Sequence, residues 1–345
     1  MTTTTRILLG CLAIVFTIGL TYASVQLPHQ VSRTLVSHMG APGFDATYHP
    51  GETEAFLGAY HLRVFGFAGL ILTGLLIVFG LIAERRGMAA AGAVLFFLPV
   101  FGHFAASMFF LAGLAMLRVV WLPILDVSHD LMALGDVVYL PYAAVVYLPV
   151  TFGFDIRDQL PWPVMGIGIG IFVAATLTWM TSKLDGRSVA DAWLYRISRH
   201  PQYLGWIIWS YGLLLYVLRH SELYQFKIRW GMPSSLPWLV STLVIIGVAM
   251  VEEIRMTRTA GDAYRDFRDR TPFLMPLPSW LSSVIATPMR LAIRRSRPET
   301  GRQVAVVIGL YAAILITASI PFVVFDWPPR IGWWGFPYNV WPLAD

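Results

Sequence analysis

The sequence predicts an all-α fold, a polytopic transmembrane helical bundle of about seven or eight apolar segments, because three observations agree. Of its 345 residues, 57% are hydrophobic and only 13% are charged, against about 25% charged residues in a typical soluble domain. The mean hydropathy is +0.63, and apolar runs recur along the whole chain. This pattern excludes a soluble globular enzyme, a disordered chain, a disulfide-stapled secreted domain and a protein with a single membrane anchor.

Charge and cysteine content leave few other classes of protein open. The net charge of +5 and the pI near 9.4 are typical of basic cytoplasmic loops in a membrane protein, so we expect no nucleic-acid partner. The single cysteine, Cys11, excludes an intrachain disulfide. The eight histidines show no spacing typical of metal ligands, so we expect no metal site.

Eight apolar runs approach the roughly 20 residues that a membrane-crossing helix needs. The first has no convincing signal-peptidase site before Pro28, so we expect an uncleaved first span. Residues 25–62 are polar and rich in glycine and proline, which predicts a loop outside the membrane. The eight runs are residues 7–24, 64–83, 88–117, 131–152, 161–182, 203–218, 236–251 and 303–325.

The basic residues predict which ends of the helices face the cytoplasm. Seventeen of the 25 lie between Lys183 and Arg302, and the positive-inside rule places their loops, together with the turn at Arg86, on the cytoplasmic side. Three apolar runs separate Arg86 from Lys183, an odd number that would place these residues on opposite sides. Run 131–152 carries an aspartate and two prolines, so we predict that it is re-entrant or that a neighbouring run is not a full crossing.

Two features predict how the later helices pack. Runs 203–218 and 236–251 are short, and together they predict a C-terminal hairpin that leaves the basic side and returns to it. Its ends, near Arg199 and Glu252, would then meet at one membrane face. In run 161–182, a Gly-x-Gly-x-Gly sequence without a preceding strand favours close helix packing over a phosphate site.

The stretch from Tyr195 to Trp206 begins this hairpin and reads Tyr-Arg-Ile-Ser-Arg-His-Pro-Gln-Tyr-Leu-Gly-Trp. Pro201 disfavours a helical conformation at His200 but suits a first helical turn, so we expect Arg199 and His200 in a turn just before a helix. The free N–H groups and the positive dipole end there favour a carboxylate or a phosphate. The alternative is an ordinary interfacial anchor.

Two adjacent carboxylates, Glu252 and Glu253, end the second run of the hairpin. Carboxylates at this depth are costly and are usually paired or functional. Glu252 and Arg255 stand one turn apart, so a simple ion pair is the alternative. Beyond them, an apolar stripe alternates with charged residues, which predicts a helix on the membrane surface whose stripe serves packing. The stripe consists of Met256, Ala260, Tyr264 and Phe267.

These motifs, in this order and spacing, resemble the isoprenylcysteine carboxyl methyltransferase and phospholipid methyltransferase superfamily. The resemblance covers roughly residues 161–276. It rests on Arg199-His200-Pro201-x-Tyr203-x-Gly205-Trp206, Trp209-Ser210-Tyr211-Gly212, Glu252-Glu253, Gly261-x-x-Tyr264, Pro272 and Pro276.

The resemblance implies an integral membrane enzyme that transfers a methyl group from S-adenosyl-L-methionine at the cytosolic face. The methyl acceptor would be a lipophilic or small thiol, carboxylate or amine, and membrane lipid would surround the enzyme. Glu252 would hold the ammonium or ribose of the cofactor, and Arg199 its carboxylate or an anionic substrate group. The cofactor would also be lined by Tyr195, His200, Pro201, Gln202 and Tyr203.

Methyl transfer from a sulfonium depends chiefly on alignment of the reacting atoms, which can contribute on the order of 7–11 kcal/mol at best. A carboxylate or thiolate acceptor needs no base. An amine or thiol would need one, and Glu253 and His200 are the candidates. With Arg199, they make up the expected catalytic residues.

With this resemblance the chain divides into three parts. Residues 1–125 form an N-terminal transmembrane extension with the polar loop at 25–62, and residues 126–276 form a methyltransferase-like membrane core. Residues 277–345 form an interfacial helix, a final span and an aromatic tail. The stretch 279–297 is basic and amphipathic, which predicts contact with anionic lipid.

Several positions depart from the superfamily pattern. Val248 replaces an arginine that the isoprenylcysteine enzymes carry four residues before the cofactor glutamate, which argues against a prenylcysteine carboxylate substrate. Phe267 replaces a tyrosine, and Ala192-Trp193-Leu194-Tyr195 replaces the usual Gly-x-Tyr entry.

Two alternatives to a methyltransferase stay open. Membrane sterol reductases, which use NADPH, also resemble this chain through Arg-His-Pro-x-Tyr, an acidic pair and a closing proline region. They typically carry an acidic residue where Trp206 stands. The other alternative is a non-enzymatic membrane protein that keeps the hairpin.

Overall fold

The structure, a computed structural model, describes residues 3–39, 55, 57–106, 116–187, 189–220 and 235–324. These residues form helices and no strands, and five of the helices are long and apolar enough to cross a membrane. The predicted class, a polytopic helical bundle, is confirmed. The five helices are α1 (Thr3–Met39), α3 (Leu62–Ile82), α7 (Pro161–Leu184), α9 (Ser235–Arg270) and α11 (Gly301–Val324).

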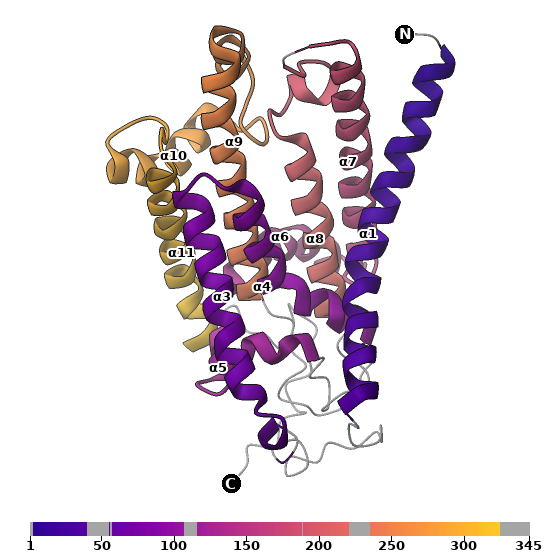
Figure 1. Cartoon of the computed structure of the whole chain (residues 1–345), viewed down its shortest axis with the longest axis vertical. Helices are drawn as coiled ribbons and strands as arrows, with labels where there is room; N and C mark the ends of the chain where they lie inside the picture. The colour runs from indigo at the N-terminus through magenta and orange to yellow at the C-terminus, as the bar shows by residue number, and fades with distance from the viewer. Residues whose placement is uncertain are drawn as a thin grey trace.

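Two further helices run lengthwise through the bundle, and shorter elements connect them (Figure 1). The lengthwise helices are α4 (Arg86–Ala106) and α8 (Pro201–His220). The short elements are η1 (Met116–Trp121), α5 (Leu122–Leu125), η2 (His129–Ala133), η3 (Asp136–Tyr139), α6 (Leu140–Thr151), η4 (Trp193–Arg196) and α10 (Ser279–Ile293).

One end of the bundle gathers the arginine-rich segments, and we call it the basic end. The turn between α3 and α4, the loop between α7 and α8, and the end of α9 all lie there, in the upper part of Figure 1. Run 131–152 is split among η2, η3 and the 12-residue α6, and 12 helical residues span about 18 Å against a hydrocarbon core of about 30 Å. This division into short elements supports the prediction that run 131–152 is re-entrant or that a neighbouring run is not a full crossing, and the turn at Arg86 and the loop after Lys183 lie at the same end.

The expected loop over residues 25–62 is wrong for its first part, because α1 continues as a helix to Met39. Between Pro28 and Met39 the sequence contains no glycine, and the glycine- and proline-rich cluster that indicated a loop starts only at Gly40. Helix-compatible residues therefore extend the first span well beyond its apolar run. Residues 40–54 and 56 lie outside the described residues.

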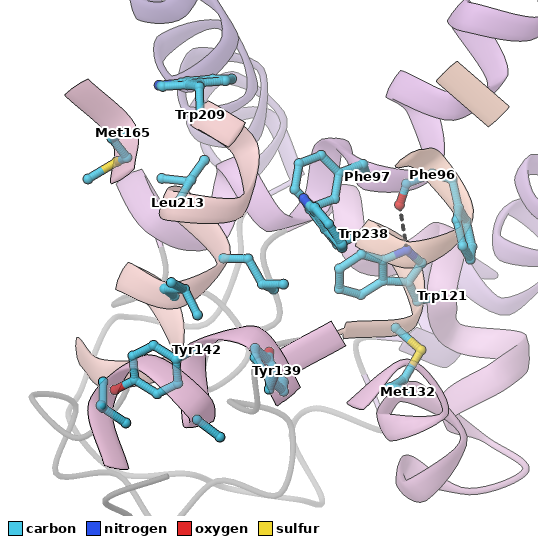
Figure 2. Packing of buried hydrophobic residues seen from close by; sticks show 14 residues of the cluster. Phe96, Phe97, Trp121, Met132, Tyr139, Tyr142, Met165, Trp209, Leu213 and Trp238 are labelled. Atoms are coloured by element: carbon cyan, nitrogen blue, oxygen red, sulfur yellow. Dashed lines mark hydrogen bonds between the residues drawn. The ribbon is translucent and has the colours of Figure 1, made fainter. Parts of the chain in front are cut away.

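The main apolar core lies in the half of the bundle away from the basic end. It joins aromatic side chains from α4, η1, η3, α6, α8 and α9 (Figure 2). The indole N–H of Trp121 donates to the carbonyl of Phe96 over 3.0 Å, so the one polar atom of this buried ring is satisfied. A second core cluster surrounds α9 with side chains of α3, α4 and α11. The two clusters hold α8 and α9 in place, so core packing sets where both helices lie at the basic end.

Helix α10 forms where the basic amphipathic stretch 279–297 predicts a helix. It buries none of its residues, and the large apolar side chains of Trp280, Val284 and Leu291 are exposed. Four arginines lie on it or directly after it. This combination keeps anionic lipid as the expected partner of α10.

Candidate functional site

The Arg-His-Pro segment is held in a turn directly before α8. The backbone N–H of His200 donates to Ser198 Oγ over 3.2 Å, and the N–H of Arg199 donates to the carbonyl of Pro272 over 3.0 Å. Pro201 is the first residue of α8, where its missing N–H costs no helical hydrogen bond. The sequence prediction of a turn that presents Arg199 and His200 is therefore confirmed.

Glu253 gathers two of the predicted residues into a buried network. Its Oε1 lies 3.0 Å from Arg199 Nε and 3.2 Å from His200 Nε2. The side chains of Arg199, His200 and Glu253 are only 8%, 6% and 14% exposed. Arg199 Nη1 also donates to the carbonyl of Arg268 over 3.2 Å. The guanidinium and the imidazole are therefore fixed by the same carboxylate.

Burial and charge oppose each other at Arg199. Burial lowers the pKa of this guanidinium below its usual value, while the neighbouring carboxylate of Glu253 works in the other direction. Arginine stays protonated in proteins, so removal of Glu253 would leave a buried positive charge without its partner. Removal of Glu253 alone is therefore expected to destabilise the turn.

Glu252 lies one residue away and has different surroundings. Tyr203 Oη donates to its Oε2 over 2.8 Å, and Arg86 Nη1 donates to its Oε1 over 3.0 Å. Its side chain is 28% exposed, twice the fraction of Glu253. Of the two carboxylates, Glu252 is therefore the one that a bound molecule can reach.

Arg86 is the residue of this site that the sequence did not predict. It lies 166 positions before Glu252, in the N-terminal extension and outside the stretch that resembles methyltransferases. Its only sequence signal was the basic turn Glu84-Arg85-Arg86, which we used for orientation alone. The alternative that Glu252 pairs with Arg255 gives way to this long-range ion pair with Arg86.

Gln202 and Tyr195 are fixed by contacts with neighbouring elements. The side-chain amide of Gln202 donates to Thr176 Oγ1 of α7 over 3.3 Å. Tyr195 is buried in a cluster with Ala175, Tyr264 and Phe267. Burial, and next the charge of Glu252, raise the pKa of Tyr195, so its phenol stays protonated. Both residues lie near the turn, and their contact with a cofactor stays a prediction.

The apolar stripe that ends α9 packs on protein. Tyr264 and Phe267 are buried against Tyr195 and Ala175, so the expected packing role is confirmed, and the location of this helix on the membrane surface stays a prediction. A kink at Gly261, with φ of 54° and ψ of −128°, interrupts the helix. The kink turns the last part of α9 back onto the loop before α8.

We expect Gly261→Ala to weaken the packing of the last part of α9 against the loop before α8. An L-residue at that φ and ψ is strained by about 1–3 kcal/mol, so the variant should unfold at a lower temperature in detergent than the unchanged protein. Gly309→Ala in α11 is the matched control, because a Cβ there meets nothing within 4 Å and needs no positive φ. Equal unfolding temperatures of the two variants would contradict this role of Gly261.

Comparisons with known proteins give one match. A family model described as a protein of unknown function, DUF1295, matches residues 142–271, and that family includes steroid 5-alpha reductase-like members. The matched stretch holds Arg199, His200, Glu252 and Glu253 but excludes Arg86. No curated protein and no solved structure matches the chain. The chain is thus a membrane-associated helical protein whose residues 142–271 match DUF1295.

Proposed function

We propose that this protein is an integral membrane methyltransferase that uses S-adenosyl-L-methionine and acts at the cytoplasmic face. The observation that carries the proposal is the separation of roles between the two adjacent glutamates. The carboxylate of Glu253 is occupied by Arg199 and His200 inside the protein. The carboxylate of Glu252 accepts a hydrogen bond from Tyr203 and remains partly exposed. Beside the Arg-His-Pro turn the chain thereby holds one partly exposed carboxylate, which also pairs with Arg86.

The chemistry of these groups suits S-adenosyl-L-methionine. The cofactor carries an ammonium, two ribose hydroxyls and a sulfonium, all of which favour a nearby carboxylate. Glu252 would accept hydrogen bonds from the ammonium or the ribose, and charge-assisted bonds of this kind are shorter and stronger than neutral ones. The arginines of the basic end support a cytoplasmic location for the site by the positive-inside rule.

The side chains of the site orient the bound molecules, and one of them accepts a proton. The bound cofactor supplies an electrophilic methyl group. A carboxylate accepts hydrogen bonds only, so in the neutral ring of His200 the proton lies on Nε2, which faces Glu253, and Nδ1 is the nitrogen that can take a proton. Nδ1 of His200 is thus the proposed base for an amine or thiol acceptor, and this acceptor must reach a side chain that is only 6% exposed. Glu253 then acts by fixing the tautomer and orientation of that ring.

The acceptor is a lipophilic or small thiol, carboxylate or amine. Val248, at the position of the substrate arginine in the isoprenylcysteine enzymes, is only 2% exposed and belongs to the core around α9. A charged side chain could not replace it without burying an unpaired charge. This favours an acceptor other than a prenylcysteine carboxylate.

An NADPH-dependent membrane reductase is the second candidate. It is favoured by the DUF1295 match, because that family includes steroid 5-alpha reductase-like members. Against it stands Trp206, which occupies the typically acidic reductase position and packs on Trp209 with ring centroids 4.9 Å apart. A residue in that packing supplies no carboxylate to a cofactor.

Ligand binding by the purified protein in detergent distinguishes these candidates. We expect micromolar binding of S-adenosylhomocysteine, and Glu252→Gln should weaken it about 10- to 100-fold, because it removes a charge-assisted hydrogen bond worth about 1.5–3 kcal/mol. His200→Ala should also weaken it. Asp262→Asn is the matched control, because this carboxylate is 89% exposed at the same end. Saturable NADPH binding without S-adenosylhomocysteine binding would overturn the proposal in favour of the reductase.

A further inference from the structure

We infer that Arg86 binds the carboxylate of the cofactor's amino-acid end, beside the ammonium held by Glu252. The inference rests on the proposed function and assigns a cofactor ligand to the N-terminal extension. It also moves this role away from Arg199, to which the resemblance assigned it. Three structural observations carry the inference.

The first observation is that helix packing places Arg86 opposite Glu252. Ala89 and Ala93 of α4 are buried in the core cluster that contains Val248 and Val251 of α9. Arg86 lies three residues before Ala89, which puts it on the same face of α4 one turn nearer the basic end. Glu252 lies four residues after Val248, likewise one turn further. The two helices therefore bring the pair to their observed separation of 3.0 Å.

The second observation is that this part of α4 is firmly held. A Cβ at Gly80 would come within 3.0 Å of the Ala89 backbone, so α3 and α4 approach as closely as glycine permits. The N–H of Arg85 donates to the carbonyl of Gly80 over 2.7 Å. Ser241 Oγ of α9 donates to the carbonyl of Ala93 over 2.7 Å. The start of α4, which carries Arg86, is thus tied to both neighbouring helices through Arg85, Ala89 and Ala93.

The third observation is the difference between the two arginines. Arg199 is 8% exposed and bound to Glu253 and to the carbonyl of Arg268. The side chain of Arg86 is 47% exposed. A guanidinium has five N–H donors in a planar fork, and the bond from Nη1 to Glu252 leaves donors for a second carboxylate. Arg86 is therefore the arginine that an incoming ligand can engage.

The chemistry of an α-amino acid matches this pair of side chains. Its ammonium and carboxylate are bonded to one carbon atom, so they need an anion and a cation side by side in the protein. Glu252 and Arg86 provide them, and each would form an ion pair with one end of the ligand while Arg86 Nη1 stays bonded to Glu252. A guanidinium also binds carboxylates through two parallel hydrogen bonds, which fixes the direction of the ligand.

A pair of ligands tests this inference. S-adenosylhomocysteine and S-adenosyl-3-thiopropylamine share the adenosine, the thioether and the amine, and only the first has the carboxylate. We expect the unchanged protein to bind S-adenosylhomocysteine at least tenfold more tightly. Arg86→Gln should remove that preference while it leaves the affinity for the amine within about twofold, and Arg86→Lys should keep part of it, because charge remains without the planar fork.

Arg85→Gln is the matched control, because it removes an exposed arginine of the same turn, and it should keep the full preference. Thermal unfolding of each variant in detergent verifies that it is folded. If Arg86→Gln keeps the preference, or weakens both ligands equally, the inference is wrong and the proposed function stands. If the unchanged protein binds neither ligand, both are wrong.

Discussion

Glu253→Gln is expected to lower the unfolding free energy by about 3 kcal/mol, because it removes the counter-charge of a buried guanidinium. Arg199 is only 8% exposed, and its Nε lies 3.0 Å from Glu253. The neutral amide also cannot hold the imidazole of His200 as a carboxylate does. We therefore expect weaker binding of S-adenosylhomocysteine together with a lower unfolding temperature, both measured in detergent.

A double variant separates the structural role of this pair from its role in binding. Arg199→Met with Glu253→Met replaces the ion pair by apolar side chains of similar size, an exchange that is often neutral or stabilising in proteins. We expect it to unfold at a higher temperature than Glu253→Gln but still to bind the ligand poorly. If Glu253→Gln alone unfolds at the temperature of the unchanged protein, the ion pair does not hold the turn.

The second large effect is expected at the crossing of α7 and α8. A Cβ at Gly168 would lie closer than 3.0 Å to the backbone of Trp209 and to the carbonyl of Gly205. Gly168→Ala should therefore push the two helices apart and lower the unfolding free energy by about 1–3 kcal/mol. This loss exceeds the gain of up to about 1 kcal/mol in helix propensity. Thermal unfolding in detergent measures the difference.

Gly166→Ala and Gly170→Ala are the controls for this prediction, because a Cβ at either position meets nothing within 4 Å. Both should be neutral or slightly stabilising. The displaced α8 begins at Pro201 and carries Tyr203, so Gly168→Ala should also weaken ligand binding, unlike its neighbours. Equal stability of all three variants would show that α7 and α8 can separate without cost.

The same three glycines show which part of the helix packing the local sequence predicts. The Gly-x-Gly-x-Gly pattern predicts close packing and is confirmed at Gly168, but Gly166 and Gly170 face open space. A helix presents successive residues to different sides, so three glycines at a spacing of two cannot all face one partner. Which of them does so depends on how α7 is rotated against α8, and composition does not fix that rotation.

The hairpin is the part of the candidate site that the sequence predicted best. Two apolar runs joined by a polar segment must return to the face they left, so Arg199 and His200 were expected near Glu252 and Glu253. The structure shows His200 Nε2 3.2 Å from Glu253 Oε1 and Tyr203 Oη 2.8 Å from Glu252 Oε2. Proline stereochemistry and helix length carried that prediction, and both are local properties of the chain.

The sequence by itself determined the class of the protein, its apolar runs, the turn before α8 and the carboxylate pair, because these depend on composition and on neighbours along the chain. Only the tertiary structure decided that Glu253 is enclosed with Arg199 while Glu252 stays accessible, and that Arg86 reaches Glu252 across 166 positions. The contact of Arg86 depends on how α4 and α9 pack, and the enclosure of Arg199 depends on the part of α9 beyond the kink at Gly261, where the carbonyl of Arg268 accepts its hydrogen bond. A long-range contact of this kind is set by the shape of the packed helices, which no local pattern encodes.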